Sequence, residues 1–310
     1  MNALLWGKGM VVRRTRLLVI VSAILVFAAG GLALADQPED KVQAGAGAFA
    51  FTPDVARPLH KLKVWTYRPD GFGPNSPIVF VMHGVGRNGE NYRDAWIPLS
   101  RARSFLLVVP EFPKDEYPGE AYQRGNITDR AGKPVPPERW TFNVIEKLFD
   151  HVKTLTESKA EKYYLYGHSA GGQFVQRFVL FMPEARYARA IAANPGYYTF
   201  PIQNVNYPYG LKGTPDANQL DPVVFARDFV LLLGAEDTNR GDPNLRKTPE
   251  ADAQGLTRFA RGINYFQTAT RVAETAHVKF NWRLVTVAGV GHSNTKMAPS
   301  AARELFSKLN

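Results

Sequence analysis

The sequence predicts an α/β fold in which helices cover both faces of a mostly parallel, doubly wound sheet. Short apolar runs of strand length alternate along the chain with longer segments whose apolar residues recur at helical spacing. Several of the short runs are apolar at every position, as strands are when both faces of their sheet are covered. The chain shows neither an internal repeat nor a dividing linker, so we expect one large domain over residues 59–310.

The first 35 residues have the pattern of an export signal. Four basic residues precede an apolar run from Leu17 to Leu34, and Ala33-Leu34-Ala35 has the A-x-A form of a cleavage site. We therefore expect a signal peptide over residues 1–35 and an exported protein, either periplasmic or extracellular. The alternative is an uncleaved membrane anchor, because the apolar run is near the lower length limit for spanning a bilayer. With cleavage, no stable membrane association is expected.

Charge and composition narrow the classes of function. The net charge is +10, and removing the four basic residues of the signal segment lowers it to +6, which favours anionic surfaces or substrates. No Lys/Arg-rich run with interleaved aromatic residues is present, so nucleic-acid binding is not expected. Cysteine is absent, which excludes disulfides and thiolate metal sites. We expect no metal and no cofactor, and nothing in the sequence indicates an oligomeric state.

The expected strands follow one another from residue 59 onward. The preceding residues 36–58 are polar and rich in Ala and Gly, and we expect them to form a tail at the mature N-terminus. Residues 62–67 alternate like a half-buried strand. The other expected strands are apolar-rich runs at Ile78–Met82, Phe105–Val109, Tyr163–Tyr166, Ala188–Ala193, Phe229–Leu233 and Arg283–Val287.

The expected helices carry apolar residues with a period near 3.6. At the start of one of them, Asn143 and Glu146 have the spacing of an N-cap residue and its partner. The expected helices are Asn143–Leu155, Ala170–Met182, Leu256–Ala276 and Pro299–Leu309.

Two long stretches interrupt the alternation. Glu111–Arg139 is rich in Pro, Gly and charge, and Pro195–Pro222 is rich in Pro, Asn and Tyr. Long loops in compact domains are often lids or binding loops, although solvated excursions also occur.

A candidate nucleophile lies between an expected strand and an expected helix. Residues 167–171 read Gly-His-Ser-Ala-Gly, which matches the Gly-x-Ser-x-Gly pattern. In that pattern the serine occupies a strained strand-to-helix turn, where bulky flanking residues would clash with the backbone. A serine hydroxyl needs an imidazole base that is oriented by a carboxylate. The sequence therefore predicts Ser169 as a nucleophile with partners further along the chain.

Two later strands end next to suitable partners. Asp237 lies in the loop after Phe229–Leu233, and His292 lies in the Gly-rich loop after Arg283–Val287. The order Ser, Asp, His is the one expected for Gly-x-Ser-x-Gly hydrolases, and the carboxyl ends of parallel strands converge at one edge of a sheet. We therefore predict Ser169, Asp237 and His292 as a catalytic triad.

Rival residues are less suitable for these roles. Glu236 is adjacent to Asp237 and is the serious rival for the acid, whereas Asp242 lies further from the strand end. His168 precedes the serine, and we expect it to point elsewhere because the turn is sharp. His60, His151 and His277 do not follow strands in this way.

An oxyanion that forms at an attacked carbonyl needs two backbone N–H donors. One is expected from Ala170, the residue after the nucleophile. The other is expected from Val85, because residues 78–86 place His83-Gly84 directly after a buried strand. An ordinary strand-ending turn is the alternative interpretation of His83-Gly84.

With these residues the chain resembles the α/β-hydrolase superfamily, and within it the secreted esterases related to poly(3-hydroxybutyrate) depolymerases and feruloyl esterases. The resemblance rests on MHGVG, YGHSAGGQF, LLLGAEDT and GVGHS in this order, and it covers about Leu59 to Leu309. It implies the α/β-hydrolase fold and a single catalytic domain over 59–310. Relatives often carry HGCGG or HGCTQ where residues 83–87 read HGVGR, and many have disulfides that this chain cannot form. These departures weaken the expectation of a polymeric substrate.

The expected function is cleavage of carboxylic esters through an acyl-enzyme. Tyr197 and Tyr198 follow a strand end and are candidate substrate contacts, as is Arg87 beside the oxyanion loop. One alternative is a serine peptidase or amidase that acts on peptides or on a polyanionic amide such as poly(aspartate), which the positive charge would suit. The other is a binding protein on a hydrolase scaffold that has lost its activity, against which the complete triad argues.

Overall fold

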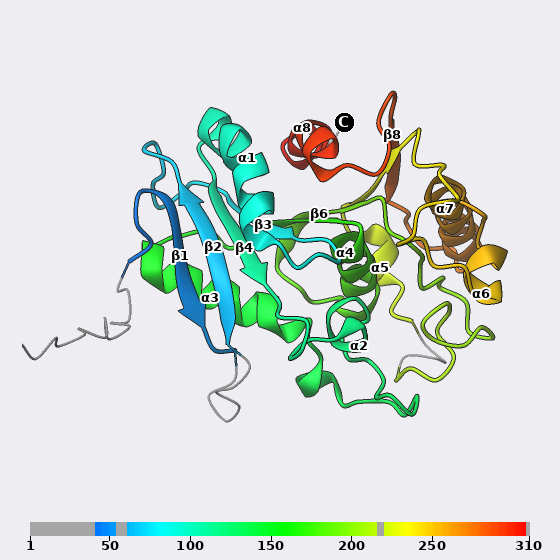
Figure 1. Cartoon of the computed structure of the whole chain (residues 1–310). Coiled ribbons are helices and arrows are strands. Elements are labelled where there is room, and N and C mark those ends of the chain that lie inside the picture. The colour runs from blue at the N-terminus through cyan, green and yellow to red at the C-terminus, as the bar shows by residue number, and fades with distance from the viewer. Residues whose placement is uncertain (1–40, 54–60, 216–219, 308–310) are drawn as a thin grey trace, which may run out of the picture. The chain divides into compact units, whose positions relative to one another are not determined.

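Eight strands form one sheet in the computed structural model, which describes residues 41–53, 61–215 and 220–307 (Figure 1). Within these ranges the strand order is β1-β2-β4-β3-β5-β6-β7-β8. Strands β3 to β8 pair in parallel, and β1 and β2 join antiparallel at one edge. The strands are β1 (Gly45–Phe51), β2 (Leu62–Arg68), β3 (Ile78–Met82), β4 (Leu106–Glu111), β5 (Tyr163–His168), β6 (Tyr187–Ala193), β7 (Phe229–Gly234) and β8 (Arg283–Val287).

Helices cover both faces of this sheet. Alternate side chains of each central strand point to opposite faces, and each face forms a separate apolar core with the helices that pack on it. In β3, Phe80 joins one core and Val81 the other, and all five residues of the strand are buried. The helices α3 (Asn143–Thr156), α4 (Ala170–Phe181) and α7 (Arg258–Thr275) pack on the first face. The helices α1 (Gly89–Arg103) and α8 (Asn294–Leu305) pack on the second face. The predicted fold class is confirmed.

Short helices occupy the connections between these layers. They are α2 (Gly119–Tyr122), a 3₁₀ turn η1 (Pro137–Arg139), α5 (Val223–Ala226) and α6 (Pro249–Ala253). The stretches predicted as long insertions, 111–139 and 195–222, carry α2 and η1 in the first case and end at α5 in the second. Both stretches leave the carboxyl-terminal side of a strand, β4 and β6 respectively.

The prediction of a tail over residues 36–58 is wrong for its middle part. Residues 45–51 form β1, which pairs with β2 along seven positions. Phe49 and Phe51 are buried and both rings contact His151 of α3. The alternation of small residues with phenylalanines was the signal for a half-buried edge strand, and it was obscured by the high Ala and Gly content.

Other differences concern the helices. Helix α1 was not expected, because Pro98 and many polar residues interrupt its apolar pattern. Helix α8 begins at Asn294, five residues before the expected start, and Pro299 lies inside it. Asn143 is the first residue of α3 instead of its cap, and its side-chain amide donates to the carbonyl oxygen of Pro137 over 2.7 Å.

The expected signal peptide, residues 1–35, lies outside the described residues. The described residues all belong to one compact unit. Among them, no helix combines the length and apolar character needed to cross a membrane. The described part of the chain also contains no group of three or more His, Asp or Glu side chains arranged to hold a metal ion.

Candidate active site

Ser169 lies at the sharp corner between β5 and α4. Its backbone has φ 57° and ψ −113°, a conformation that residues other than glycine rarely adopt. The Ser169 amide donates to the carbonyl oxygen of Ala193 on β6, and its carbonyl accepts from Gln173 one turn into α4. These two hydrogen bonds, one to β6 and one to α4, fix the corner on both sides. The hydroxyl is presented above the carboxyl ends of the strands.

The glycines around Ser169 are required by close backbone approaches. A Cβ atom on Gly167 would lie 2.2 Å from the carbonyl oxygen of Gly171, and one on Gly172 would lie 2.6 Å from that of Ala193. A Cβ atom on Gly171 would lie 2.1 Å from the carbonyl oxygen of Met82 on β3. Contacts this short do not occur, so the helix can approach the sheet only with glycine at these positions.

Gly171→Ala is expected to lower the free energy of unfolding by about 3 kcal/mol, because the methyl group forces α4 away from β3. Gly73→Ala is the matched control, since a Cβ atom there meets nothing within 4 Å. We expect the control to stay within about 1 kcal/mol of the parent protein. Urea unfolding midpoints measure both effects, and equal midpoints would contradict the close approach.

The three predicted triad side chains form a continuous hydrogen-bonded chain. His292 Nε2 lies 2.9 Å from Ser169 Oγ, and His292 Nδ1 lies 2.7 Å from Asp237 Oδ2. Asp237 follows the end of β7, and His292 lies in the loop between β8 and α8. The Asp237 side chain is 2% exposed and that of His292 is 21% exposed. A carboxylate, an imidazole and a hydroxyl in this order can move a proton from the serine.

Asn194 joins the loops that carry these residues, and sequence reasoning missed it. It follows β6 directly, has φ 46° and is almost fully buried. Its amide nitrogen donates to the carbonyl oxygen of Gly291, and its amide oxygen accepts from the backbone N–H of Gly234. An asparagine directly after a strand is a signal for such a left-handed position, because its short polar side chain tolerates it.

Arg258, at the start of α7, was also missed. Its guanidinium Nη1 lies 3.4 Å from Asp237 Oδ1 and 2.9 Å from Asp242 Oδ2. The rival Glu236 is exposed, and its side chain takes no part in these contacts. Within the described chain the acid next to the imidazole is therefore Asp237.

The expectation that His168 points away from the site is wrong. Its ring centroid lies 4.7 Å from that of His292, and its Nδ1 lies 3.1 Å from the hydroxyl of Tyr92 on α1. Burial, followed by the nearby His292 and Arg258, lowers the pKa of His168 well below its usual value. His168 is therefore neutral and lies beside His292. It is the last residue of β5, and its side chain is directed toward α1.

The predicted oxyanion loop follows β3 and lies against the nucleophile. A Cβ atom on Gly84 would approach Ser169 Cβ to 3.8 Å. Neither the Val85 nor the Ala170 amide donates to a backbone carbonyl in the turns and loops of the described chain. Val85 is 46% exposed at the rim, and Ala170 is the first residue of α4. These two amides are therefore available as donors, as the N–H groups at the start of a helix are in general.

The ring of His83 fixes the position of this loop by hydrogen bonds to two backbone groups. Its Nε2 accepts from the amide of Phe112, which leaves the proton on Nδ1 to be donated to the carbonyl oxygen of Gly84 over 3.0 Å. Burial lowers the pKa of His83 to about 3, so this arrangement persists at neutral pH. The Tyr122 hydroxyl also donates to the carbonyl oxygen of His83.

A cavity of about 460 Å³ opens at the triad. Polar side chains dominate its lining, and its large apolar groups among the described lining residues are Val85 and the ring of Tyr92. The lining comes from four stretches of the chain and consists of Gly84, Val85, Gly86, Asn88, Asn91, Tyr92, His168, Ser169, Asn244, His292, Ser293, Asn294 and Thr295. A site with this lining suits a polar substrate better than a long alkyl chain.

The three predicted substrate contacts lie elsewhere. Arg87 turns back and donates to the carbonyl oxygens of Phe112 and Tyr117, so it anchors the oxyanion loop. Tyr198 is fully buried and stacks on Tyr265 of α7. Tyr197 is 4% exposed and lies among arginines. None of the three predicted contacts lines the cavity. For Tyr197 and Tyr198 the reason is that the loop after β6 turns inward, so that both side chains are buried beneath it.

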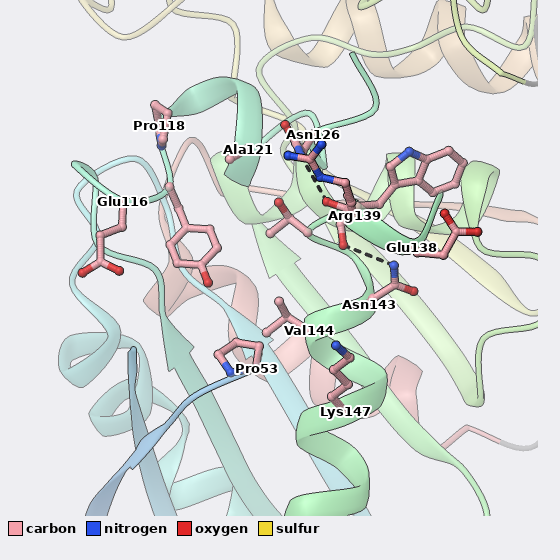
Figure 2. A pocket seen from close by; sticks show the side chains of 13 residues that line it. Pro53, Glu116, Pro118, Ala121, Asn126, Glu138, Arg139, Asn143, Val144 and Lys147 are labelled. Atoms are coloured by element: carbon pink, nitrogen blue, oxygen red, sulfur yellow. Dashed lines mark hydrogen bonds between the residues drawn. The ribbon is translucent and has the colours of Figure 1, made fainter. Parts of the chain in front are cut away.

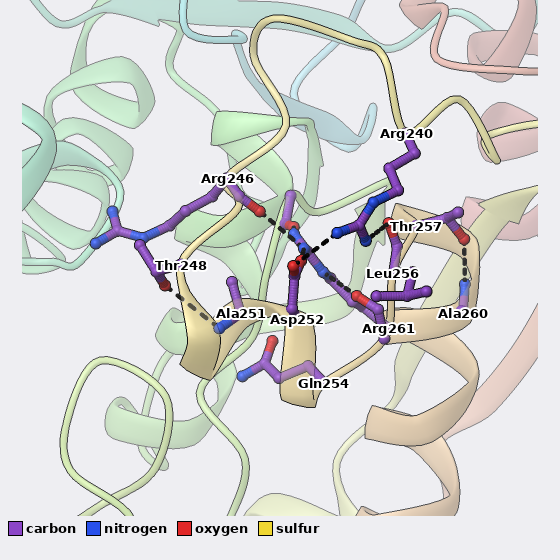
Figure 3. A network of polar contacts seen from close by, with 12 residues as sticks. Arg240, Arg246, Thr248, Ala251, Asp252, Gln254, Leu256, Thr257, Ala260 and Arg261 are labelled. Atoms are coloured by element: carbon purple, nitrogen blue, oxygen red, sulfur yellow. Dashed lines mark hydrogen bonds and ion pairs between the residues drawn. The ribbon is translucent and has the colours of Figure 1, made fainter.

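A polar network fixes the segment between Asp237 and α7 (Figure 3). The Arg261 guanidinium donates to the carbonyl oxygens of Gly255, Gly196 and Arg246 over 2.7–2.8 Å and pairs with Asp252 at 3.1 Å. Arg240 pairs with the second oxygen of Asp252 at 2.9 Å. One buried arginine thus ties the loop after β6 to the loop after β7.

A second cavity, of about 370 Å³, lies between α2, η1 and α3 (Figure 2). The side chains of Arg139, Asn143 and Lys147 face it, and Asn126 donates to the carbonyl oxygen of Arg139 at its rim. Its described lining contains no histidine and no residue of the triad. It is therefore not a second site for the same chemistry.

Comparisons with solved structures identify two close relatives. The poly(aspartic acid) hydrolase-1 from Sphingomonas sp. KT-1 is 41% identical, has a TM-score of 0.80, and matches 86% of this chain and 100% of its own. LpqC, a poly(3-hydroxybutyrate) depolymerase from Bordetella parapertussis, is 35% identical, has a TM-score of 0.80, and matches 85% of this chain and 90% of its own.

The other comparisons are less informative. An S-formylglutathione hydrolase from Agrobacterium tumefaciens is 16% identical with a TM-score of 0.50, a likeness of fold alone. Among curated proteins, the magnesium-chelatase 30 kDa subunit of Rhodobacter capsulatus is 25% identical over 219 residues, which span 70% of this chain and 66% of that relative. No protein-family model matches the chain. From the two close structures and the shared fold, the chain belongs to the α/β-hydrolase superfamily, is related there to a poly(3-hydroxybutyrate) depolymerase and a poly(aspartic acid) hydrolase, and is itself a hydrolase.

Proposed function

We propose that this protein is a serine hydrolase that cleaves carboxylic esters through an acyl-enzyme. The observation that carries the proposal is the unbroken chain from Ser169 Oγ through His292 to Asp237, beside a cavity and two available amides. We further propose that it acts after export, because residues 1–35 have the pattern of a signal peptide.

In the proposed mechanism, Ser169 Oγ attacks the acyl carbonyl carbon while His292 Nε2 takes its proton. Asp237 holds the other ring nitrogen in the donor tautomer and stabilises the imidazolium. The Val85 and Ala170 amides donate to the oxyanion of the tetrahedral intermediate. The carbon–oxygen bond to the alcohol then breaks, the imidazolium gives its proton to the leaving oxygen, and water repeats the sequence to release the acid.

A second candidate is hydrolysis of a polyanionic amide such as poly(aspartate). It is supported by the polar cavity, by the relative at 41% identity, and by three arginines around Tyr197. The guanidinium carbons of Arg177 and Arg246 lie 4.8 and 5.1 Å from the centroid of the Tyr197 ring, and Arg124 Nε lies 3.4 Å from its hydroxyl. Burial alone would raise the pKa of Tyr197, but the three arginines together bring it below its usual value.

This arginine cluster has an excess of positive charge, and Arg246 is close in sequence to a residue of the cavity lining. Among the described residues, neither Arg177 nor Arg246 forms a salt bridge, and Arg124 reaches Glu120 only at 3.8 Å. Arg246 is partly exposed and lies two residues beyond Asn244, which lines the cavity. Glu250 and Glu120 offset part of this charge, and the remaining positive charge attracts carboxylate-rich substrates.

Arg246→Gln separates the two candidates. If the substrate is polyanionic, we expect the variant to raise KM for poly(aspartate) about tenfold, because it loses one ion pair worth roughly 1.4 kcal/mol. We expect KM for a neutral p-nitrophenyl ester to stay unchanged. Arg271→Gln on the exposed surface of α7 is the matched control. Turnover of esters without any cleavage of poly(aspartate) by the purified protein would leave the ester hydrolase as the function.

A further inference from the structure

Behind the triad lies a second carboxylate that the mechanism above does not use. Arg258 Nη1 lies 2.9 Å from Asp242 Oδ2 and 3.4 Å from Asp237 Oδ1, so the arginine is closer to Asp242. The side chains of Arg258 and Asp237 are 2% exposed, and that of Asp242 is 19% exposed. These three charges are therefore only weakly screened by solvent, and each influences the others strongly.

The charge balance of this group depends on Asp242. Without it, the buried guanidinium would neutralise Asp237 and leave little negative charge for an imidazolium at His292. With Asp242 ionised, Arg258 is compensated and Asp237 keeps its charge for His292. Burial raises the pKa of Asp242, but the hydrogen bond from Arg258 and other nearby donors and charges bring it below its usual value, so the carboxylate form is favoured.

The same carboxylate connects the triad to the cavity lining. Asp242 Oδ1 accepts from the backbone N–H of Asn244 over 2.7 Å, and Asn244 lines the cavity. On the other side, the amide of Phe259 next to Arg258 donates to the carbonyl oxygen of Asp237. The start of α7, the acid loop and the cavity loop are thus joined at one ion pair.

The other ionisable groups around His292 come from three further elements. β5 ends with His168, which burial keeps neutral, and α1 contributes Tyr92 through its hydrogen bond to His168. Burial raises the pKa of Tyr92 above its usual value, so it is neutral as well. The corner before α4 contributes only the Ser169 hydroxyl, which is uncharged. Arg258, Asp242 and Asp237 therefore supply the fixed charges in this set.

We propose that Arg258 and Asp242 form a positioning pair that sets the charge acting on the Asp237–His292 couple and holds the cavity loop to it. The inference rests on the proposed function of the triad. Asp242 is not a substitute acid, since its carboxylate faces Arg258, and neither residue touches the reacting atoms.

The test uses two single substitutions with opposite expected effects. His292 must be unprotonated to act as a base, so the acidic limb of the pH profile reports the balance of charge around it. Asp242→Asn removes a negative charge and is expected to move the acidic limb to lower pH by about one unit. Arg258→Gln removes a positive charge and is expected to move it to higher pH by about one unit. The double variant restores the net charge and is expected to return the limb toward the parent position.

The readout is the rate at which an active-site phosphonate labels the full-length mature protein, measured from pH 5 to 9. This rate does not require the natural substrate. Arg258→Lys retains the positive charge and is expected to keep the parent limb, which separates charge from packing. If Arg258→Gln does not fold, Asp242→Asn and Arg258→Lys still decide the result.

Single substitutions that both lower the rate without moving the limb, or move it in the same direction, would overturn the proposed pair. Full labelling of Ser169→Ala would instead refute the proposed function, so the two failures are distinguishable.

Discussion

Ser169→Ala is expected to lower kcat on an activated p-nitrophenyl ester by roughly 10⁴- to 10⁶-fold. The substitution removes the attacking oxygen and leaves the cavity, the two amides and the backbone corner in place. The residual rate would come from binding and oxyanion stabilisation alone. Steady-state kinetics on the purified mature protein measure the effect.

Ser158→Ala is the matched control for this experiment. Ser158 is also buried and also makes hydrogen bonds, to the carbonyl oxygen of Pro74 and from the amide of Ala160, but it precedes β5 at the opposite end from the corner. We expect the control to retain the parent kcat. A Ser169→Ala protein with unchanged kcat would show that another group performs the attack.

Asp237→Asn is expected to cost about 10³- to 10⁴-fold in kcat. The amide keeps the shape of the side chain, but its nitrogen can face His292 Nδ1, which then places the proton on Nε2, where the ring must accept from Ser169. The buried Arg258 also loses part of its compensation, which adds to the effect. The same ester assay measures the loss.

Two neighbouring acids calibrate this result. Glu236→Gln is expected to leave kcat within about twofold, because Glu236 is exposed and adjacent to Asp237 only in sequence. Asp242→Asn is expected to cost about tenfold, since it acts through Arg258. A larger loss for Asp242→Asn than for Asp237→Asn would mean that the acid of the triad is Asp242 and that the assignment is wrong.

The fold and the meeting of the three triad side chains could be predicted because both follow from local pattern and topology. Ser169 comes directly after β5, Asp237 and His292 lie in the loops after β7 and β8, and parallel strands end at a common edge. The glycines around Ser169 are visible in the sequence and indicate the tight corner, because a side chain at Gly171 would collide with β3.

Residues that act through long-range packing could not be predicted in this way. Arg258 follows no motif, and its contact with Asp237 depends on where α7 starts relative to the sheet. Tyr197 and Tyr198 were expected at the substrate because they follow a strand end. The loop after β6 instead turns inward, where Arg261 donates a hydrogen bond to it, and both tyrosines are buried. Strand ends locate loops, but the direction of the side chains in a long loop is set by its tertiary partners.

The most direct test of Ser169 as the nucleophile is to treat the mature protein with a fluorophosphonate and to identify the modified residue by peptide mass spectrometry. We expect one adduct per chain on Ser169, absent from Ser169→Ala and formed much more slowly in Asp237→Asn. No adduct on Ser169, with the folded protein intact, would contradict the proposed nucleophile and would favour a binding protein on a hydrolase scaffold.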